Sequence, residues 1–182
     1  MKYLKPMNIN KVHLFEDYTT HMKPFKERMT DFFNSIKSFN DIDEEALIQI
    51  IDYCGYEGYE DEEDAIEDLT EKIEFYKSLP NPCTLYRVVG VENEELIRKD
   101  DLGEHYTPYK WAIDGDMLMM IGSENWSDDV KAYIIEVSVP LEEIDIRQTI
   151  IQNLSFPNEH EINLKNKGKN VKVINIEETD LH

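Results

Sequence analysis

The spacing of apolar residues changes near residue 80, and this change restricts the chain to a fold that mixes helices and strands. Before Pro80, apolar residues recur every three or four positions, which is typical of amphipathic helices. After it, short apolar runs are separated by Gly, Pro, Asn and Asp, which is typical of strands. These runs lie at residues 85–89, 132–139, 161–164 and 171–176. We therefore predict an α+β protein with a helical N-terminal segment over residues 1–80 and a second part over residues 81–182.

The helical segment begins with an apolar seam over residues 15–36 that Pro24 interrupts. Proline removes a backbone donor, so we expect a kink there or a new helix that starts near Pro24. A last helix carries its apolar face over residues 66–76 and stops before Pro80.

Between these two helices, residues 43–54 predict another helix with an apolar face. Asp41 and Glu44 are spaced like a capping box at its start, and Gly55 stands where a left-handed residue ends a helix.

The charge of the chain limits its partners. The net charge is -20, from 39 acidic and 19 basic residues, so broad nonspecific binding to nucleic acid is not expected. An anionic ligand would need a local basic pocket, and the arginines available to build one are Arg28, Arg87, Arg98 and Arg147.

Cysteine content and hydropathy indicate the compartment. Cys54 and Cys83 fit neither a disulfide framework nor a zinc motif, so we expect no metal and a reducing environment. The chain has no apolar run of 18 residues and no signal-peptide pattern near Met1. We therefore expect a cytoplasmic protein with no membrane partner.

A nucleotide site, if present, must use an unusual device. The sequence contains no Rossmann glycine fingerprint and no P-loop, and it has no nucleophile elbow of the hydrolase type. Arg87, however, stands within an otherwise apolar strand between Thr84 and Gly90. A guanidinium there is costly unless it meets an anion such as a phosphate, and Gly90 would allow close approach of a ligand. A surface or salt-bridged arginine is the ordinary alternative.

Two further segments carry candidate chemistry. Thr107 followed by Pro108 predicts a corner at which a strand ending near Tyr106 passes into a helix, and capping alone would explain the threonine. Glu159 and Glu161 stand two residues apart where a turn leads into a strand, which would place both carboxylates on one face. Such a pair suits cleavage of a glycosidic bond, although two glutamates in so acidic a chain also occur by chance.

In this order, the three segments resemble the signature regions of the ADP-ribosyltransferases, in the Arg, Ser/Thr, Glu branch that includes bacterial toxins and phage enzymes. The similarity covers about residues 83–176. It implies an ADP-ribosyltransferase-like split β-sandwich with short helices, and NAD as the substrate. The usual Ser-Thr-Ser is replaced by Tyr106-Thr107-Pro108.

The resemblance also assigns roles to single residues. Arg87 would contact the phosphate or ribose of NAD, with Val88, Gly90, Tyr106 and Thr107 around the dinucleotide. Tyr106 could stack on the nicotinamide.

The same resemblance assigns the third region. Glu161 would hold the nicotinamide ribose and stabilise its cation, and Glu159 would orient the acceptor and help to deprotonate it. Phe156 and Asn158 would meet the target protein.

The function implied is a mono-ADP-ribosyltransferase of a phage or bacterial effector type, which modifies an arginine of a host or partner protein. Two alternatives stay open. One is transfer to another acceptor, including water or a nucleic acid. The other is a noncatalytic acidic inhibitor or DNA mimic on the same scaffold, which the acidic run at residues 60–64 favours.

Overall fold

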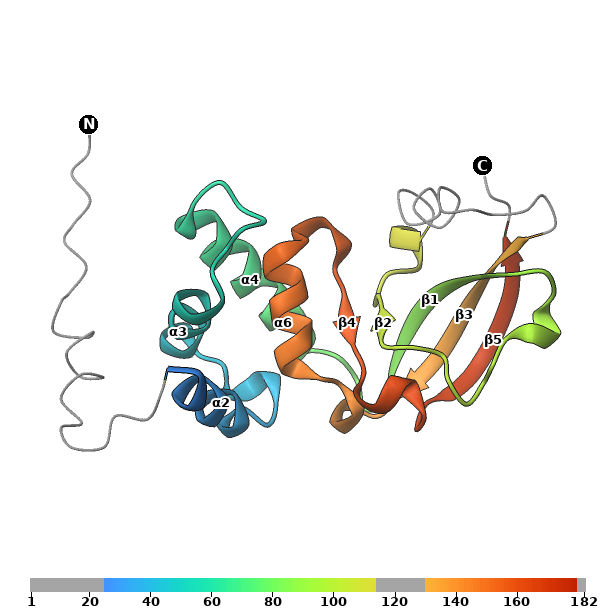
Figure 1. Cartoon of the computed structure of the whole chain (residues 1–182), viewed down its shortest axis with the longest axis horizontal. Helices are drawn as coiled ribbons and strands as arrows, with labels where there is room; N and C mark the ends of the chain where they lie inside the picture. Colours follow the sequence, from blue (N-terminus) through green and yellow to red (C-terminus); the bar gives the residue numbers. More distant parts are fainter. Residues whose placement is uncertain (1–24, 114–129, 180–182) are drawn as a thin grey trace, which may run out of the picture. The chain divides into compact units, whose positions relative to one another are not determined.

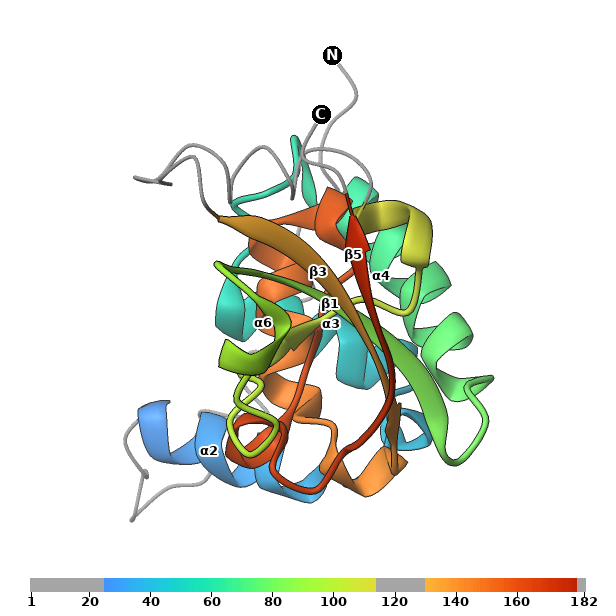
Figure 2. The ribbon, with the colours of Figure 1, turned by 90° about the vertical axis from the view of Figure 1, so that its right-hand side faces the viewer.

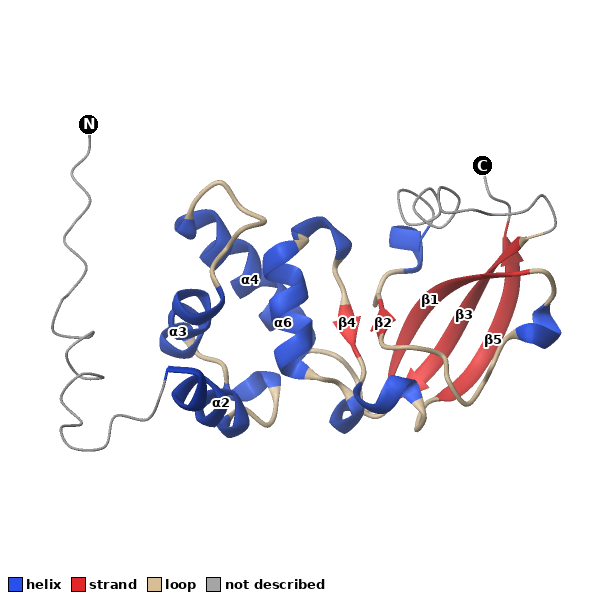
Figure 3. Ribbon diagram, viewed as in Figure 1, coloured by secondary structure: helices blue, strands red, loops and turns tan. Residues whose placement is uncertain are grey.

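The structure, a computed structural model, describes residues 25–113 and 130–179 (Figure 1). Within these residues it has four α-helices and two antiparallel sheets, which confirms the predicted α+β class (Figure 3). The chain divides into two compact units, Met1–Ser35 and Ile36–His182. The boundary expected at residue 80 therefore falls inside the second unit.

Helix α2 (Phe25–Ser35) is the described part of the first unit. It begins directly after Pro24, as the interrupted seam predicts, and residues 15–24 of that seam lie outside the described residues. The rings of Phe32 and Phe33 meet edge to face on this helix, with centroids 5.6 Å apart.

Three helices of the second unit pack on one another: α3 (Glu44–Cys54), α4 (Glu62–Lys77) and α6 (Ile146–Ser155). Their apolar faces form a core that excludes water and supplies most of the stabilisation of this part. Its buried members are Leu47, Ile50, Ile51, Ala65, Leu69, Ile73, Ile150 and Leu154.

The ends of α3 match the sequence pattern at one terminus only. Gly55 ends the helix with φ 77°, as predicted. The N-cap, however, is Asp43, whose side chain accepts an N–H of the first turn. Asp41 instead accepts from the backbone N–H groups of Lys37 and Ser38, so it caps the preceding short turn and the expected capping box at α3 is absent.

The larger sheet has the strand order β1-β3-β5, with β1 (Cys83–Val91), β3 (Lys131–Val139) and β5 (Lys172–Thr179). All pairs are antiparallel, and Figure 2 shows the three strands side by side. These strands contain the runs predicted at residues 85–89 and 132–139 and most of the run at 171–176.

The smaller sheet pairs β2 (His105–Tyr106) with β4 (Ile162–Asn163), and both lie between α6 and β1 (Figure 1). Backbone hydrogen bonds of 2.8 and 2.9 Å between Tyr86 and Thr107 attach it to β1. The segments that contain the three candidate motifs therefore meet at one place.

The corner after β2 differs from the expected strand-to-helix passage. Thr107 Oγ1 accepts the Tyr109 N–H at 3.2 Å, which closes a turn, and a short 3₁₀ helix follows at Lys110–Ile113. The predicted capping hydroxyl is thus present, but no α-helix begins at Pro108.

Candidate functional site

Arg87 reaches from β1 toward β2. Its Nη1 donates a hydrogen bond to the His105 carbonyl oxygen (3.1 Å), and the guanidinium lies over the Tyr106 ring, 5.8 Å from its centre. Burial lowers the pKa of Arg87, while Tyr106 and Glu161 act in the opposite direction. Its Nε is buried and has no hydrogen-bond partner among the described residues, which leaves a costly unmet donor.

Glu161 immediately precedes β4, and only 5% of the residue is exposed. Its Oε1 accepts a hydrogen bond from Asn163 Nδ2 at 2.7 Å and is paired with His105 Nδ1. Because the carbonyl of His105 also accepts the Arg87 hydrogen bond, the structure brings Arg87 and Glu161 to the same residue.

Helix α6 holds the backbone around Glu161. Asn153 Nδ2 donates to the Glu161 carbonyl at 2.7 Å and to the Thr149 carbonyl at the same distance. Thr149 Oγ1 in turn accepts the Asn163 N–H at 3.0 Å. Thr149, Asn153 and Asn163 are all buried, so this polar network holds the backbone on both sides of the carboxylate, which Asn163 contacts directly.

Glu159 does not share a strand with Glu161. It ends a 3₁₀ turn, Pro157–Glu159, and His160 then adopts a left-handed conformation with φ 47°. The two-residue alternation of a strand therefore does not apply, and the reason given for a common face is wrong. The side chain of Glu159 lies outside what the structure describes.

Tyr106 and Thr107 are core residues here, each 1% exposed. The Tyr106 hydroxyl faces Gly168, and burial raises the pKa of this tyrosine to about 12. The ring has no exposed face, so the suggested stacking on nicotinamide does not fit this conformation.

Val88 and Gly90 stand on the face of β1 opposite to Arg87, because side chains alternate along a strand. Val88 is buried with Ile113, Ala132 and Ile134, and Gly90 pairs with Ala132 in the ladder. Neither faces the side of the sheet that Arg87 occupies, so their assignment to the dinucleotide is not supported.

Phe156 and Asn158 lie on the surface at the turn before Glu161, with Phe156 53% exposed. Lys72 on α4 holds this turn in place through a hydrogen bond. Its Nζ donates to the Pro157 carbonyl at 2.5 Å and pairs with Asp68 at 2.7 Å, although only 5% of Lys72 is exposed. Burial lowers the pKa of this ammonium.

An aromatic cluster, not anticipated from the sequence, lies beside the same turn. Tyr109 stacks between Phe75 and Trp111, at centroid distances of 5.1 and 5.2 Å, and His160 meets Tyr109 and Trp111 edge-on. Trp111 is 63% exposed. The cluster thus ties α4 and the corner after Thr107 to the residue between the two glutamates.

His105, Asn153 and Asn163 are the site residues that sequence reasoning missed. Two of them belong to strands of two residues, which are too short for an alternation signal. Asn153 belongs to an amphipathic helix whose pattern does not distinguish a buried amide from an exposed one.

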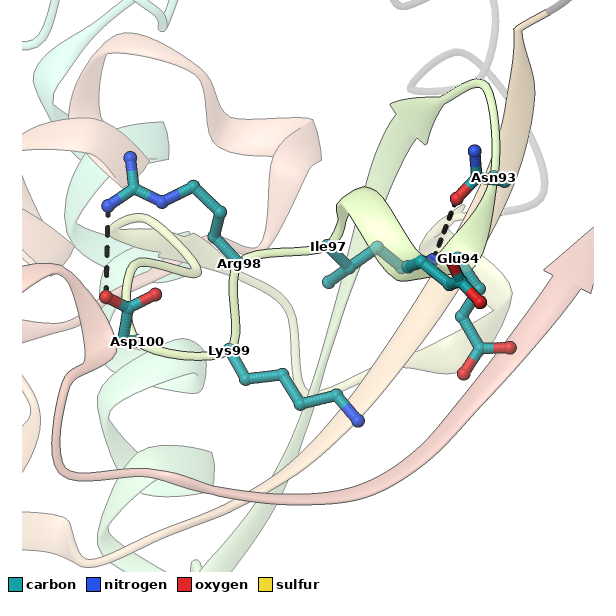
Figure 4. Close-up of a pocket in the computed structure, with 7 residues that line it drawn as sticks. Asn93, Glu94, Ile97, Arg98, Lys99 and Asp100 are labelled. Carbon is teal, nitrogen blue, oxygen red and sulfur yellow. Dashed lines mark hydrogen bonds and ion pairs between the residues drawn. The ribbon is translucent and has the colours of Figure 1, made fainter.

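A polar hollow on the segment between β1 and β2 is separate from this site (Figure 4). Its lining includes Asn93, Ile97 and Lys99, and Arg98 pairs there with Asp100 at 3.8 Å. None of the predicted site residues lines it.

Two features are absent from residues 25–113 and 130–179, the part of the chain that the structure describes. There, no group of three or more His, Cys, Asp or Glu side chains is arranged to hold a metal ion, and no helix is long and apolar enough to cross a membrane.

Comparisons with protein-family models, with curated proteins and with solved structures gave no match.

Proposed function

We propose that the chain is an NAD-dependent mono-ADP-ribosyltransferase that transfers ADP-ribose to an arginine of a host or partner protein and releases nicotinamide. One observation carries the proposal. The Arg87 guanidinium, on β1, and the buried carboxylate of Glu161, the residue before β4, contact the same residue, His105. Cleavage of NAD requires a fixed cation for its phosphates and an anion beside its nicotinamide ribose.

Arg87 is the cation in this proposal. In a chain of net charge -20, a dianionic pyrophosphate is bound only where a local cation is held in place. The Nε–H of Arg87 is buried and lacks an acceptor within the described residues, so a phosphate would meet the guanidinium through its terminal nitrogens.

Glu161 is the anion. Its Oε1 is occupied by His105 and Asn163, whereas Oε2 forms no hydrogen bond within the described residues. We assign Oε2 to the nicotinamide ribose. As the bond between C1′ and the nicotinamide nitrogen breaks, the electron pair leaves with nicotinamide and positive charge develops on the ribose. A carboxylate held in a site of low polarity stabilises that charge more strongly than one in water.

The acceptor side of the site rests on the resemblance alone. Glu159 would bind and orient the arginine of the target, and the exposed Phe156 and Asn158 would contact the target protein beside it. A glutamate at this position implies arginine as the acceptor.

The arrangement of strands also supports the proposed relation to the ADP-ribosyltransferases. A three-stranded antiparallel sheet and a separate two-stranded sheet, joined by the pairing of Tyr86 with Thr107, fit the split β-sandwich expected for residues 81–182. We assign that fold to residues 81–182 as part of the proposal.

The decisive experiment incubates the purified protein with labelled NAD and a cell lysate, measures nicotinamide release, and maps the labelled residue by mass spectrometry. Glu161→Gln is the matched control. We expect the wild type to label an arginine and Glu161→Gln to leave it unlabelled. Absence of both NAD binding and nicotinamide release by the wild type would overturn the proposal.

A noncatalytic acidic binding protein is the second candidate, and the surface of α4 favours it. This helix exposes a row of carboxylates to solvent: Glu62, Glu63, Asp64, Glu67, Glu71 and Glu74. Such a protein would bind a basic partner and leave NAD intact. The same incubation separates the two candidates, because only the enzyme consumes NAD.

A further inference from the structure

His105 and Glu161 form a dyad in which a buried carboxylate fixes a solvent-accessible imidazole. The side chain of His105 is 51% exposed and that of Glu161 only 7%, and the two meet at His105 Nδ1 and Glu161 Oε1. Arg87 Nη1 fixes the backbone of His105 at the same time, through its carbonyl oxygen. The imidazole is therefore held at its inner edge and open at its outer edge.

The contact with the carboxylate decides which ring nitrogen is basic. An ionised carboxylate accepts hydrogen bonds and donates none, so the proton of a neutral imidazole in this pair lies on Nδ1. Nε2 then carries the free lone pair, and the described residues provide it with no hydrogen bond. A carboxylate that orients a histidine in this way also stabilises the imidazolium that forms when Nε2 takes a proton.

We propose that His105 is the general base of the transfer step, an inference that rests on the proposed function. A target arginine is positively charged and must lose a proton to become a nucleophile. The C1′–nicotinamide bond breaks, and its electron pair leaves with nicotinamide. The lone pair of the guanidine nitrogen forms the new bond to C1′, and the proton from that nitrogen passes to His105 Nε2.

The competing role for His105 is to position Glu161 and nothing more. An asparagine at position 105 distinguishes the two roles, because it can preserve the positioning of Glu161 but not the base. The amide nitrogen of asparagine takes nearly the place of Nδ1 and keeps a donor for Glu161, but it has no basic nitrogen. An alanine removes both the donor and the base.

The test compares His105→Asn and His105→Ala with wild type in two assays, transfer to arginine and nicotinamide release with water as acceptor. Water needs no prior deprotonation to attack a ribosyl cation, whereas an arginine does. We expect His105→Asn to lose about 10²-fold more in transfer to arginine than in nicotinamide release with water as acceptor. Added imidazole should restore part of the transfer by His105→Ala, because the position is open to solvent.

Three results would overturn the assignment. Full transfer by His105→Asn would show that no base is needed there. Equal loss of both activities in a folded, NAD-binding His105→Asn would show that the residue only positions Glu161. A wild-type protein that neither binds nor cleaves NAD would overturn the proposed function itself. This outcome differs from a failure of the His105 assignment, because it is seen with the wild type alone.

Discussion

Gly103 lies directly against the Arg87 guanidinium, in a left-handed conformation with φ 87°. A Cβ built on this glycine would lie 2.5 Å from Arg87 Nη1 and 2.7 Å from its central carbon. The segment before β2 therefore sets the position of the arginine that we assign to the phosphates of NAD.

Gly103→Ala should consequently displace Arg87 as well as strain the backbone. We expect a loss of about 1–3 kcal/mol in the free energy of unfolding, together with weaker NAD binding, measured by denaturant unfolding and calorimetric titration. Gly55→Ala is the matched control, because Gly55 has φ 77° but no atom within 4 Å of the added carbon. It should lower stability through strain alone and leave NAD binding unchanged; equal binding losses in both would contradict the contact with Arg87.

Glu161→Gln tests the chemical step. The amide keeps the size of the side chain but removes the negative charge that stabilises the ribosyl cation. Turnover of NAD should fall by about 10²–10³-fold while NAD binding changes little. Steady-state kinetics and equilibrium binding measure the two quantities, and unchanged turnover would remove Glu161 from the chemistry.

Glu159→Gln tests the acceptor side. If Glu159 orients the target arginine, this variant should still release nicotinamide from NAD with water as acceptor, but it should no longer modify arginine. The two activities are compared on one preparation with an arginine-containing target and without it. Equal loss of both would assign Glu159 to the cleavage of NAD instead.

Tyr106→Phe should stabilise the protein at neutral pH. The hydroxyl of Tyr106 is buried without a hydrogen-bond partner in the described residues, so its removal should raise the free energy of unfolding by about 1 kcal/mol. Tyr59→Phe is the matched control and should destabilise, because the Tyr59 hydroxyl donates to the Asp68 carboxylate. Thermal or denaturant unfolding of the two variants gives opposite signs if this account is correct.

The same tyrosine makes a prediction for alkaline pH. Burial raises the pKa of Tyr106 from 10.0 to about 12, so the unfolded chain loses this proton first as pH rises. The contribution of this pKa difference to the free energy of unfolding is fully present below pH 10, and it is lost as the pH rises toward 12. Tyr106→Phe should therefore show a shallower loss of stability between these values, and an unchanged slope would mean that Tyr106 is not closed off from water.

The sequence predicted those parts of the fold that have a long periodic signal. The helices α3 and α4 and the strands β1 and β3 follow from apolar spacing, since each buries one or both faces over nine or more residues. Arg87 and Glu161, two residues that the resemblance singles out, contact the same residue, His105. Both are fixed by neighbours in the sheets.

Other features depend on backbone geometry that residue spacing does not report. The left-handed His160 separates Glu159 from the strand, so strand alternation gave the wrong reason for pairing the glutamates. The contact of His105 with Glu161 joins residues distant in sequence through a sheet with only two residues in each strand. Tyr106 becomes a core residue because the segment around Gly168 covers it.

The hydrogen bond from Lys72 to the Pro157 carbonyl has a practical consequence for dividing this protein. A fragment that starts at residue 81 would lack the ammonium that holds the turn before Glu161, and it would also uncover the faces of α6 that pack on α3 and α4. The smallest piece suitable for crystallisation or for grafting onto another protein therefore begins ahead of α3. Designs that exchange the helical part for another segment must keep a cation in the place of Lys72.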